Sequence, residues 1–278
     1  MNKTSLEKNP FTNQSASNAY KSVDPIYEMS AKFVLEFVNP KEFPQNARIM
    51  DIGAGTGIAS EKIVDTGVGR LTLLEPSPAM LEQAKNKLNS KADYIESSIE
   101  NIDITALEPF DLVYALNCFH LFQDLSKALA NIACLLKPSA VFVFNISSPT
   151  YSFDKMSETE KFIIQKNLEF YQELNKLVSS PIVAHTVELL QKILEGNSLV
   201  TFTKNKIQSL FNSVDLELAN YTEVVIKIHN EYQKNIWRMI GTAFSTDSNA
   251  IEQIITKINL PDEVEIRQAI FKFSNSYK

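Results

Sequence analysis

The part of the sequence best suited to chemistry is a run of closely spaced glycines. The chain contains 7 glycines, and Gly53, Gly55 and Gly57 fall within residues 51–57, which read DIGAGTG. Glycine lacks a Cβ atom and adopts positive φ readily, so its backbone can turn sharply and bring N–H groups against a ligand. We therefore expect a cradle for a cofactor here. A tight turn that binds nothing is the alternative interpretation.

The spacing of the glycines distinguishes between cofactors. A dinucleotide-binding loop follows the pattern G-x-G-x-x-G, which requires glycine at position 58, but that residue is Ile58. A dinucleotide places its pyrophosphate at the helix start, whereas S-adenosylmethionine has no phosphate and presents a zwitterionic amino-acid tail. Asp51, directly before the glycines, suits the ammonium group of that tail. The loop therefore favours S-adenosylmethionine.

A second carboxylate stands at the end of the next expected strand. Glu75 lies in the segment LLEPS, eighteen residues after Gly57. A carboxylate in this position can accept hydrogen bonds from both ribose hydroxyls of an adenosine. A solvated strand end, or a neighbour of a helix N-cap, is the alternative. The glycine loop and Glu75 together are more specific than either feature alone.

Short apolar runs alternate with amphipathic segments around these residues. Strands that are buried on both faces and separated by helices are typical of a parallel, doubly wound α/β sheet, in which ligands bind beyond the carboxyl ends of the strands. The expected strands are residues 48–52, 71–74, 92–95, 112–115 and 141–144, with helices starting near residues 56, 77 and 126.

The chain divides into four parts on these patterns. Residues 1–16 are polar and aperiodic, which predicts a flexible N-terminal arm. Residues 17–149 contain an N-terminal helix and the core that binds the cofactor. Residues 150–204 carry long helical patterns without a strand between them and are expected to form an inserted helical lid. Residues 205–278 return to the core sheet.

Composition limits the partners of the chain. The net charge is −6 and no run of Lys or Arg occurs, so we expect neither nucleic acid nor a membrane as partner. No secretory signal and no apolar stretch of about 18 residues occur, which predicts a cytoplasmic location.

Cys118 and Cys134 are expected to be buried, reduced thiols. A monomer or a homodimer is expected.

These residues resemble the class I S-adenosylmethionine-dependent methyltransferases, in particular the group that acts on small molecules. Residues 51–57 resemble that family's first motif, residues 74–81 its second, residues 97–102 its third and residues 110–120 its fourth. The resemblance implies a Rossmann-like, seven-stranded and mostly parallel sheet with an inserted lid. It also implies S-adenosylmethionine as cofactor and S-adenosylhomocysteine as product.

The resemblance further implies a set of cofactor contacts. Tyr20 and Asp51 belong to it, with Gly53, Ala54 and Gly55 at the amino-acid tail, Glu75 at the ribose, Pro76, Ser77 and Met80 around the adenine, Ser98 and Ile99 closing the adenine pocket, and Leu116 and Asn117 on the methionine side. Tyr20 could equally be a core residue.

Two positions depart from the family pattern. Ser98 replaces an Asp, and Lys-Pro-Ser-Ala at residues 137–140 replaces Lys-Pro-Gly-Gly.

The expected chemistry needs no elaborate catalytic group. Methyl transfer from a sulfonium is an in-line displacement with an activated leaving group, so alignment supplies much of the rate. His120 is the candidate for a base or an acceptor-orienting group, with simple packing as its alternative. No metal is expected. Aromatic residues of the insert pack its helices, and some of them could select an acceptor with apolar surface.

The expected function is O- or N-methylation of a small-molecule acceptor. A non-catalytic S-adenosylmethionine-binding protein is one alternative, because one fold serves many functions. A nucleotide-dependent oxidoreductase is the other, and Ile58 disfavours it.

The variant Gly55→Val tests the glycine loop. A β-branched side chain should abolish cofactor binding, because it disfavours positive φ and blocks close approach of the ligand to the backbone, while the domain stays folded. Isothermal titration calorimetry measures the binding, and circular dichroism checks the fold. Binding at wild-type affinity would refute our assignment of the loop.

Overall fold

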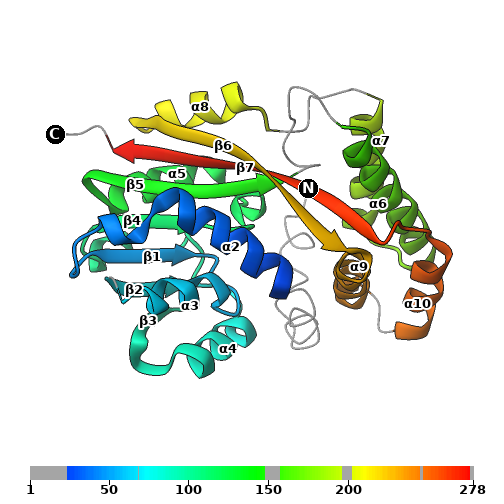
Figure 1. The fold of residues 1–278 in the computed structure, drawn as a ribbon, viewed down its shortest axis with the longest axis horizontal. Coiled ribbons are helices and arrows are strands. Elements are labelled where there is room, and N and C mark those ends of the chain that lie inside the picture. The colour runs from blue at the N-terminus through cyan, green and yellow to red at the C-terminus, as the bar shows by residue number, and fades with distance from the viewer. Residues whose placement is uncertain (1–23, 68, 148–156, 196–201, 245–246, 276–278) are drawn as a thin grey trace, which may run out of the picture. The chain divides into compact units, whose positions relative to one another are not determined.

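A computed structural model of the protein describes residues 24–67, 69–147, 157–195, 202–244 and 247–275 (Figure 1). The chain groups into two compact units. The sheet unit comprises residues 27–153, 202–226 and 267–278, and the helical unit comprises residues 1–26, 154–201 and 227–266. Within the described residues, no helix is both long enough and apolar enough to cross a membrane.

One seven-stranded sheet runs through the described part of the chain. Its strands are β1 Arg48–Ile52, β2 Arg70–Leu74, β3 Ala92–Ile95, β4 Phe110–Ala115, β5 Leu136–Ser147, β6 Leu216–His229 and β7 Glu263–Asn275. Their order is β3-β2-β1-β4-β5-β7-β6 (Figure 1). Strands β1 to β5 pair in parallel, and β7 pairs antiparallel with β5. The expected mostly parallel α/β sheet is confirmed.

The strand order reverses between β1 and β4. In a doubly wound sheet, such a reversal leaves a crevice outside the carboxyl ends of the two strands, because the connections leave toward opposite faces. β1 lies between β2 and β4, so the segments that follow these three strands meet at the same edge of the sheet. These segments contain the glycine loop, Glu75 and Asn117.

Alternate residues of the strands face two separate hydrophobic cores. Met50 and Val113 contribute to the first core, whereas their neighbours Ile49 and Leu112 contribute to the second. Successive strand residues point to opposite faces, so a sheet that is covered on both sides has nearly continuous apolar strands. Helices α5 Leu125–Leu135 and α8 Lys204–Asn212 cover the first core, and α2 Asp24–Val38, α3 Ile58–Asp65 and α4 Pro78–Leu88 cover the second.

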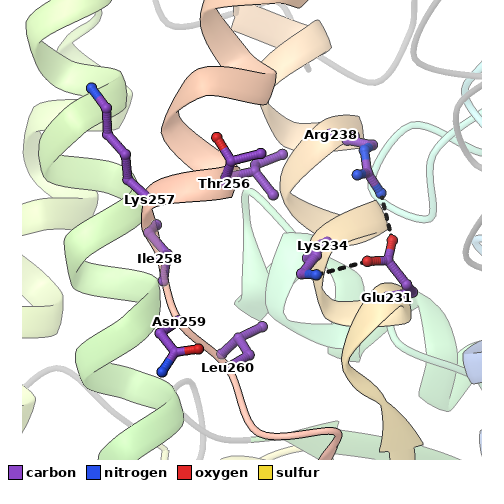
Figure 2. A pocket seen from close by; sticks show the side chains of 9 residues that line it. Glu231, Lys234, Arg238, Thr256, Lys257, Ile258, Asn259 and Leu260 are labelled. Atoms are coloured by element: carbon purple, nitrogen blue, oxygen red, sulfur yellow. Dashed lines mark hydrogen bonds and ion pairs between the residues drawn. The ribbon is translucent and has the colours of Figure 1, made fainter.

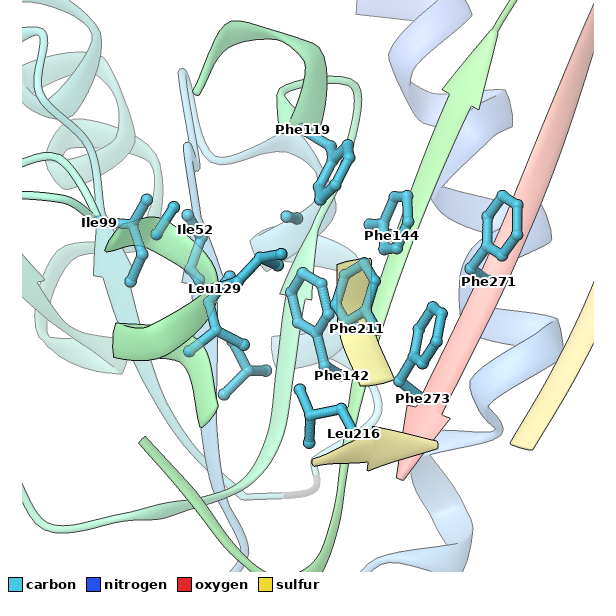
Figure 3. Packing of buried hydrophobic residues seen from close by; sticks show 14 of the residues in the cluster. Ile52, Ile99, Phe119, Leu129, Phe142, Phe144, Phe211, Leu216, Phe271 and Phe273 are labelled. Atoms are coloured by element: carbon cyan, nitrogen blue, oxygen red, sulfur yellow. The ribbon is translucent and has the colours of Figure 1, made fainter. Parts of the chain in front are cut away.

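Phenylalanine rings dominate the first core (Figure 3). The ring of Phe144 on β5 lies 4.1 Å from that of Phe119, 5.4 Å from Phe211 on α8 and 5.1 Å from Phe271 on β7, measured between centroids. Each aromatic pair adds about 0.5–1.5 kcal/mol beyond the area that it buries. Phe119 belongs to the segment after β4, so this packing anchors that segment to the sheet.

The helical unit contains four described helices. They are α6 Glu158–Leu177, α7 Pro181–Leu194, α9 Asn230–Phe244 and α10 Ser248–Lys257. A capping box begins α6, because Glu160 N donates to Ser157 Oγ at 3.1 Å while Ser157 N donates to Glu160 Oε2 at 2.7 Å. Trp237 of α9 stacks on Phe170 of α6 at 5.4 Å and donates its indole N–H to Asn167 Oδ1 at 2.8 Å.

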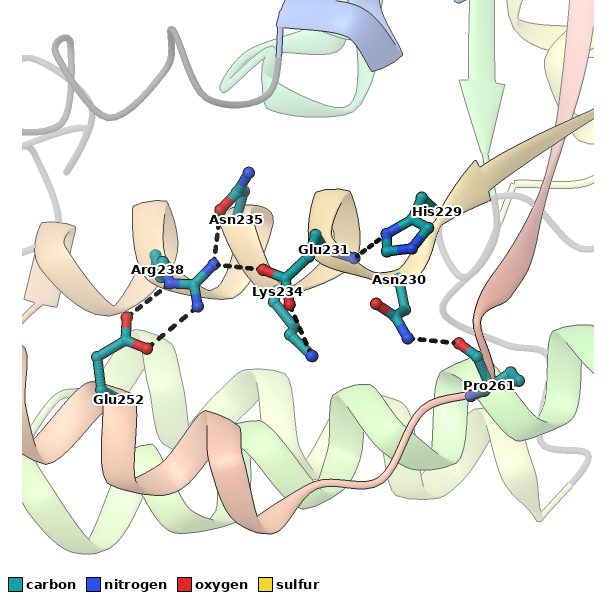
Figure 4. A network of polar contacts seen from close by, with 8 residues as sticks. All are labelled: His229, Asn230, Glu231, Lys234, Asn235, Arg238, Glu252 and Pro261. Atoms are coloured by element: carbon teal, nitrogen blue, oxygen red, sulfur yellow. Dashed lines mark hydrogen bonds and ion pairs between the residues drawn. The ribbon is translucent and has the colours of Figure 1, made fainter.

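A polar network joins α9 to its neighbours (Figure 4). Arg238 donates to both carboxylate oxygens of Glu252 on α10, at 2.6 and 3.1 Å, and also to Glu231 at 3.2 Å. Asn230 Nδ2 donates to the Pro261 carbonyl at 2.9 Å. The fork of the guanidinium matches a carboxylate in two parallel hydrogen bonds, so Arg238 sets the position of α10 against α9.

The structure corrects the expected burial of Cys134. Cys118 is buried, but Cys134 is exposed, and both are free thiols. Helix α5 buries Ile132 and Leu135 among other residues. Cys134 follows Ile132 by two positions, about 200° around the helix, and so falls on the outward face. An apolar sequence neighbourhood therefore did not imply burial.

The turn that lacks the family's two glycines keeps a glycine-like backbone. Ser139 adopts φ +63° in the segment 137–140, a left-handed conformation that is unfavourable for residues with a Cβ atom. The segment forms the start of β5. The missing glycines therefore change the local strain of the turn rather than the fold.

A matched pair of glycine substitutions tests the packing behind the glycine loop. Gly53 and Gly67 have similar φ angles of +65° and +69°, so strain from an added methyl group is similar at both. A Cβ on Gly53 would lie 2.8 Å from Cys118 Sγ, whereas one on Gly67 would meet nothing within 4 Å. Gly53→Ala should therefore lower the free energy of unfolding by about 1–3 kcal/mol more than Gly67→Ala. Urea unfolding measures the difference, and equal losses would contradict the close contact.

Candidate cofactor site

The glycine loop connects the end of β1 to the start of α3. Its three glycines all have positive φ, at +65°, +55° and +78° for Gly53, Gly55 and Gly57. Gly53 N and Ala54 N both donate to the carbonyl of Leu74 at the end of β2, at 2.8 and 3.2 Å. The loop is therefore held against β2, and its conformation is one that residues with a Cβ atom disfavour.

Gly55 leaves room for a ligand. A Cβ atom at this position would have Met80 Sδ as its nearest neighbour, at 4.0 Å. The predicted cofactor residue Met80 therefore lies beside the loop. Any side chain on Gly55 would extend into this open space, so the structure favours a loss of ligand binding over a loss of folding in the Gly55→Val variant.

Glu75 joins the two loops of the site. Its Oε2 accepts the N–H of Gly55 at 2.9 Å, and its Oε1 accepts the N–H of Ser77 at 2.8 Å. Burial raises the pKa of Glu75, and these two hydrogen bonds act in the opposite direction. A carboxylate has about four lone-pair sites, so each oxygen keeps capacity for a ribose hydroxyl.

Asp51 is buried behind the loop. Ser60 Oγ donates to Asp51 Oδ2 at 2.6 Å, and the hydroxyl of Tyr114 also interacts with this carboxyl group. The pKa of Asp51 is raised to about 7, mainly by burial and in small part by the charge of Glu75, although the hydrogen bonds from Ser60 and Tyr114 lower it. One oxygen thus faces α3, and a contact between Asp51 and the cofactor's ammonium stays a prediction.

The residues predicted around the adenine begin α4. Ser77 is the N-cap of this helix, with its Oγ accepting the N–H of Met80 at 3.4 Å, and Pro78 occupies the first turn. Pro76 lies between Glu75 and the cap. The two loops of the site are therefore continuous with the starts of α3 and α4.

The segment after β3 contains the other two predicted adenine residues. Ile99 is buried, and its carbonyl accepts a hydrogen bond from Asn131 of α5 at 2.8 Å. The Ser98 carbonyl accepts the N–H groups of Asn101 and Ile102. These bonds hold the segment in a compact turn, and a hydrogen bond from the Ser98 hydroxyl to adenine stays a prediction.

Asn117 follows β4 and forms part of a network that the sequence did not indicate. Its backbone N–H donates to Asn145 Oδ1 of β5, and the network continues to Gln268 of β7 and Ser30 of α2. Leu116 is half-buried against the second core. Asn145 interrupts an apolar run of β5, and Gln268 takes a position that Val264, Ile266 and Ile270 predict to be apolar in the alternation of β7. These polar residues were the sequence signal that could have found the network.

Thr56 is a further residue that sequence reasoning missed. Its hydroxyl lies within the glycine loop, is buried, and has no hydrogen-bond partner in the described part of the chain. A buried hydroxyl without a partner costs about 1–3 kcal/mol, so it favours a ligand or a water that supplies one. Its position inside the predicted cradle was the available signal.

His120 lies in the 3-10 turn Phe119–Leu121 after β4. Desolvation by the surrounding protein lowers the pKa of His120 to about 4, although its side chain keeps exposed surface. The ring is therefore neutral at neutral pH and has a lone pair available for a proton. The same desolvation weakens it as a base, and its role stays a prediction.

Three predictions from the sequence remain. Tyr20 lies outside the described residues. In the part of the chain that the structure describes, no three His, Cys, Asp or Glu side chains gather as a metal site would require. The insert aromatic Phe170 packs against Trp237, and Phe202 packs against Phe119 in the first core.

The helical unit contains a pocket of about 350 Å³ between α9 and the end of α10 (Figure 2). Within it, Glu231 accepts hydrogen bonds from Lys234 at 2.7 Å and from Arg238 at 3.2 Å. This carboxylate and Glu252 neutralise the two cations. Lys257 is a third cation of the lining, and we assign no chemistry to the pocket.

Sequence comparisons identify the domain that contains the glycine loop. Residues 50–144 match the model of the methyltransferase domain family. A ubiquinone biosynthesis O-methyltransferase from Xanthomonas axonopodis is 29% identical over 107 residues, which cover 37% of this chain and 44% of that protein. The highly reducing polyketide synthase cm3B from Cordyceps militaris is 31% identical over 121 residues, 38% of this chain and 5% of the synthase. The match spans less than half the length of either relative.

Solved structures share the fold. Phosphoethanolamine N-methyltransferase 2 from Haemonchus contortus, solved with S-adenosyl-L-methionine, superposes with a TM-score of 0.52 at 13% identity, over 89% of this chain and 52% of that one. The [4+2]-cyclase SpnF superposes with a TM-score of 0.54 at 10% identity, over 92% of this chain and 81% of that one.

The strand order and the glycine loop at the end of β1 define a doubly wound α/β domain. Residues 50–144 of this fold, which include the glycine loop and Glu75, match the methyltransferase domain family.

The variant Asp51→Asn tests the buried carboxyl group. The pKa of wild-type Asp51 rises from 3.8 to about 7 in the folded protein. The contribution of this residue to the free energy of unfolding is therefore full below the unfolded pKa, where the carboxyl group is protonated, and is lost as the pH rises through about 7. Relative to wild type, the variant's free energy of unfolding should therefore increase with pH between about 4 and 7, by at most about 1.4 kcal/mol per pH unit. Urea unfolding of both proteins over this range measures it. A difference that is independent of pH would contradict the raised pKa.

Proposed function

We propose that the protein transfers the methyl group of S-adenosylmethionine to an oxygen or nitrogen of a small-molecule acceptor. The observation that carries the proposal is the position of Glu75. Its buried carboxylate is fixed between the glycine loop and the start of α4 by the N–H groups of Gly55 and Ser77. An adenosine ribose beside the loop would meet this carboxylate with both hydroxyls.

The residues of the site fit S-adenosylmethionine. The glycine loop has no side chain at Gly55 to exclude a ligand, and the Thr56 hydroxyl lacks a partner among the described residues. Glu75 would hold the ribose, and the segments at residues 76–80 and 98–99 would enclose the adenine. When bound, the cofactor supplies a methyl group on a sulfonium, whose departure as a thioether needs no protonation.

The protein's part in the reaction is mainly alignment. Holding two reactants in a near-attack geometry contributes up to about 7–11 kcal/mol, compared with about 3–5 kcal/mol for one general base. Asn117 and His120 follow β4, at the edge of the sheet where the cofactor's methionine side is expected. A neutral His120 would accept a proton from the acceptor or orient it by a hydrogen bond.

A small acceptor with apolar surface is the substrate class that we favour. The ubiquinone O-methyltransferase and the phosphoethanolamine N-methyltransferase are both named for small-molecule methylation. We further propose that residues 150–204 act as a lid that selects the acceptor. Nucleic acid and membrane are not proposed as partners, and a cytoplasmic monomer or homodimer stays a prediction.

A second function requires an explicit test. The cyclase named above shares the fold and carries another activity in its name, so the domain could bind S-adenosylmethionine without transferring its methyl group. A nucleotide-dependent oxidoreductase is the weaker alternative. Incubation with radiolabelled S-adenosylmethionine and a metabolite extract would separate transfer from binding alone.

Substitution of Glu75 tests the proposed ligand. Glu75→Ala should weaken binding of S-adenosylhomocysteine by about 100-fold, because two charge-assisted hydrogen bonds are lost. Isothermal titration calorimetry measures the dissociation constant, with NADH as the competing cofactor. The control is Glu82→Ala, which removes an exposed glutamate of α4. Tight NADH binding, or equal affinity in both variants, would overturn the proposal.

A further inference from the structure

A chain of carboxamides lies behind the segment that follows β4. Asn117 N donates to Asn145 Oδ1 at 2.8 Å. Asn145 Nδ2 in turn donates to Asn117 Oδ1 at 2.8 Å and to Gln268 Oε1 at 3.0 Å. Gln268 Nε2 donates to Ser30 Oγ at 2.9 Å and to Asn117 Oδ1 at 3.3 Å. All four residues belong to the sheet unit, and all but Asn117 are buried.

One backbone donor sets the orientation of every amide in this chain. A backbone N–H can only donate, so the Asn145 atom that faces Asn117 N must be its oxygen. Asn145 Nδ2 then faces the side chains of Asn117 and Gln268, and the atom that it meets on each must be an oxygen. Asn117 accordingly has its Oδ1 turned into the network and its NH₂ group turned away from it.

The NH₂ group of Asn117 is available to a ligand. It has no acceptor among the residues that the structure describes, and Asn117 is only half-buried. The next residue, Cys118, contacts the glycine loop, since its Sγ lies 2.8 Å from where a Cβ on Gly53 would be and interacts with the Ile52 carbonyl at 3.0 Å. Asn117 is therefore the direct chain neighbour of a residue that packs on the glycine loop.

The polarity of Asn117 selects one group of the cofactor's amino-acid tail. The tail carries an ammonium group, which only donates hydrogen bonds, and a carboxylate, which only accepts them. We propose that Asn117 Nδ2 donates to this carboxylate and that Asn145 is the positioning residue that turns Nδ2 toward it. The inference rests on the proposed function, because it requires S-adenosylmethionine in the site. The ammonium group of the tail would then face Asp51, the acidic residue directly before the glycines.

The variant Asn117→Asp reverses the polarity of the exposed atom. An aspartate keeps an oxygen toward Asn145 and Gln268, but it replaces the free NH₂ group with a negatively charged oxygen. The dissociation constant of S-adenosylhomocysteine should rise about 10-fold or more, because a hydrogen bond to a charged group is replaced by repulsion. Decarboxylated S-adenosylmethionine keeps the ammonium and lacks the carboxylate, so its affinity should stay unchanged or increase.

The variant Asn145→Asp tests the positioning role from a residue that does not touch the ligand. The introduced carboxylate would still accept the backbone N–H of Asn117, but it could no longer donate to the Asn117 side chain. That side chain should then turn its NH₂ group inward and its oxygen outward. Binding of S-adenosylhomocysteine should weaken again, with the decarboxylated ligand little affected. General damage to the site would weaken both ligands alike.

The control is the same chemical change at the last residue of β7. Asn275→Asp removes hydrogen bonds from Asn275 Nδ2 to the carbonyls of Leu136 and Lys137, both at 3.2 Å, and should leave the ratio of the two affinities at the wild-type value. Calorimetric titration of each folded variant with both ligands gives the ratios. If the Asn145 variant does not fold, the Asn117 variant decides.

The outcomes separate this inference from the function on which it rests. Weaker binding of S-adenosylhomocysteine by the Asn117 and Asn145 variants, with binding of decarboxylated S-adenosylmethionine retained, supports the inference. Equal losses of both ligands, or unchanged binding of S-adenosylhomocysteine, would overturn it. Failure of the wild-type protein to bind either ligand would refute the proposed function instead.

Discussion

A buried carboxylate persists in a protein only where donors surround it, and this constraint organises the site around Glu75. Its two oxygens take one N–H from the glycine loop and one from the start of α4. Gly55 must hold its positive φ to keep this geometry, and Gly53 must stay small because Cys118 packs against it. The two loops therefore form one unit before any ligand binds, held by the Glu75 side chain and by the backbone hydrogen bonds from Gly53 and Ala54 to Leu74.

The same edge of the sheet carries an excess of buried negative charge. Burial raises the pKa of both Asp51 and Glu75, and no cationic side chain contributes to either shift. Two such carboxylates destabilise the folded protein at neutral pH unless something positive approaches them. S-adenosylmethionine brings a sulfonium and an ammonium group. The electrostatics of the site thus favour a cationic ligand over the anionic pyrophosphate of a dinucleotide, in agreement with Ile58 in the loop.

The segment after β4 is held from two directions. Phe119 packs into the phenylalanine cluster on one face of the sheet, and Asn117 is hydrogen-bonded to Asn145 of β5 and Gln268 of β7. Packing determines where the segment lies, whereas the amide network determines which atom of Asn117 faces away. The antiparallel strand β7 contributes to the phenylalanine cluster through Phe271 and to the amide network through Gln268.

Local patterns in the sequence were sufficient for the parallel strands β1 to β5 and for the positions of the glycine loop and Glu75 after β1 and β2, whereas their contacts with a cofactor stay a prediction. Apolar runs, glycine spacing and a carboxylate at a strand end are short-range features, and each has a direct physical meaning for the backbone. The same reasoning was wrong about Cys134, because the side of a helix that is buried depends on what packs against it. Tertiary structure alone decided the roles of Asn145, Gln268 and Ser30, which lie up to 238 positions apart in the chain. Hydrogen-bond polarity depends on partners that such distant strands bring together, and no local pattern encodes them.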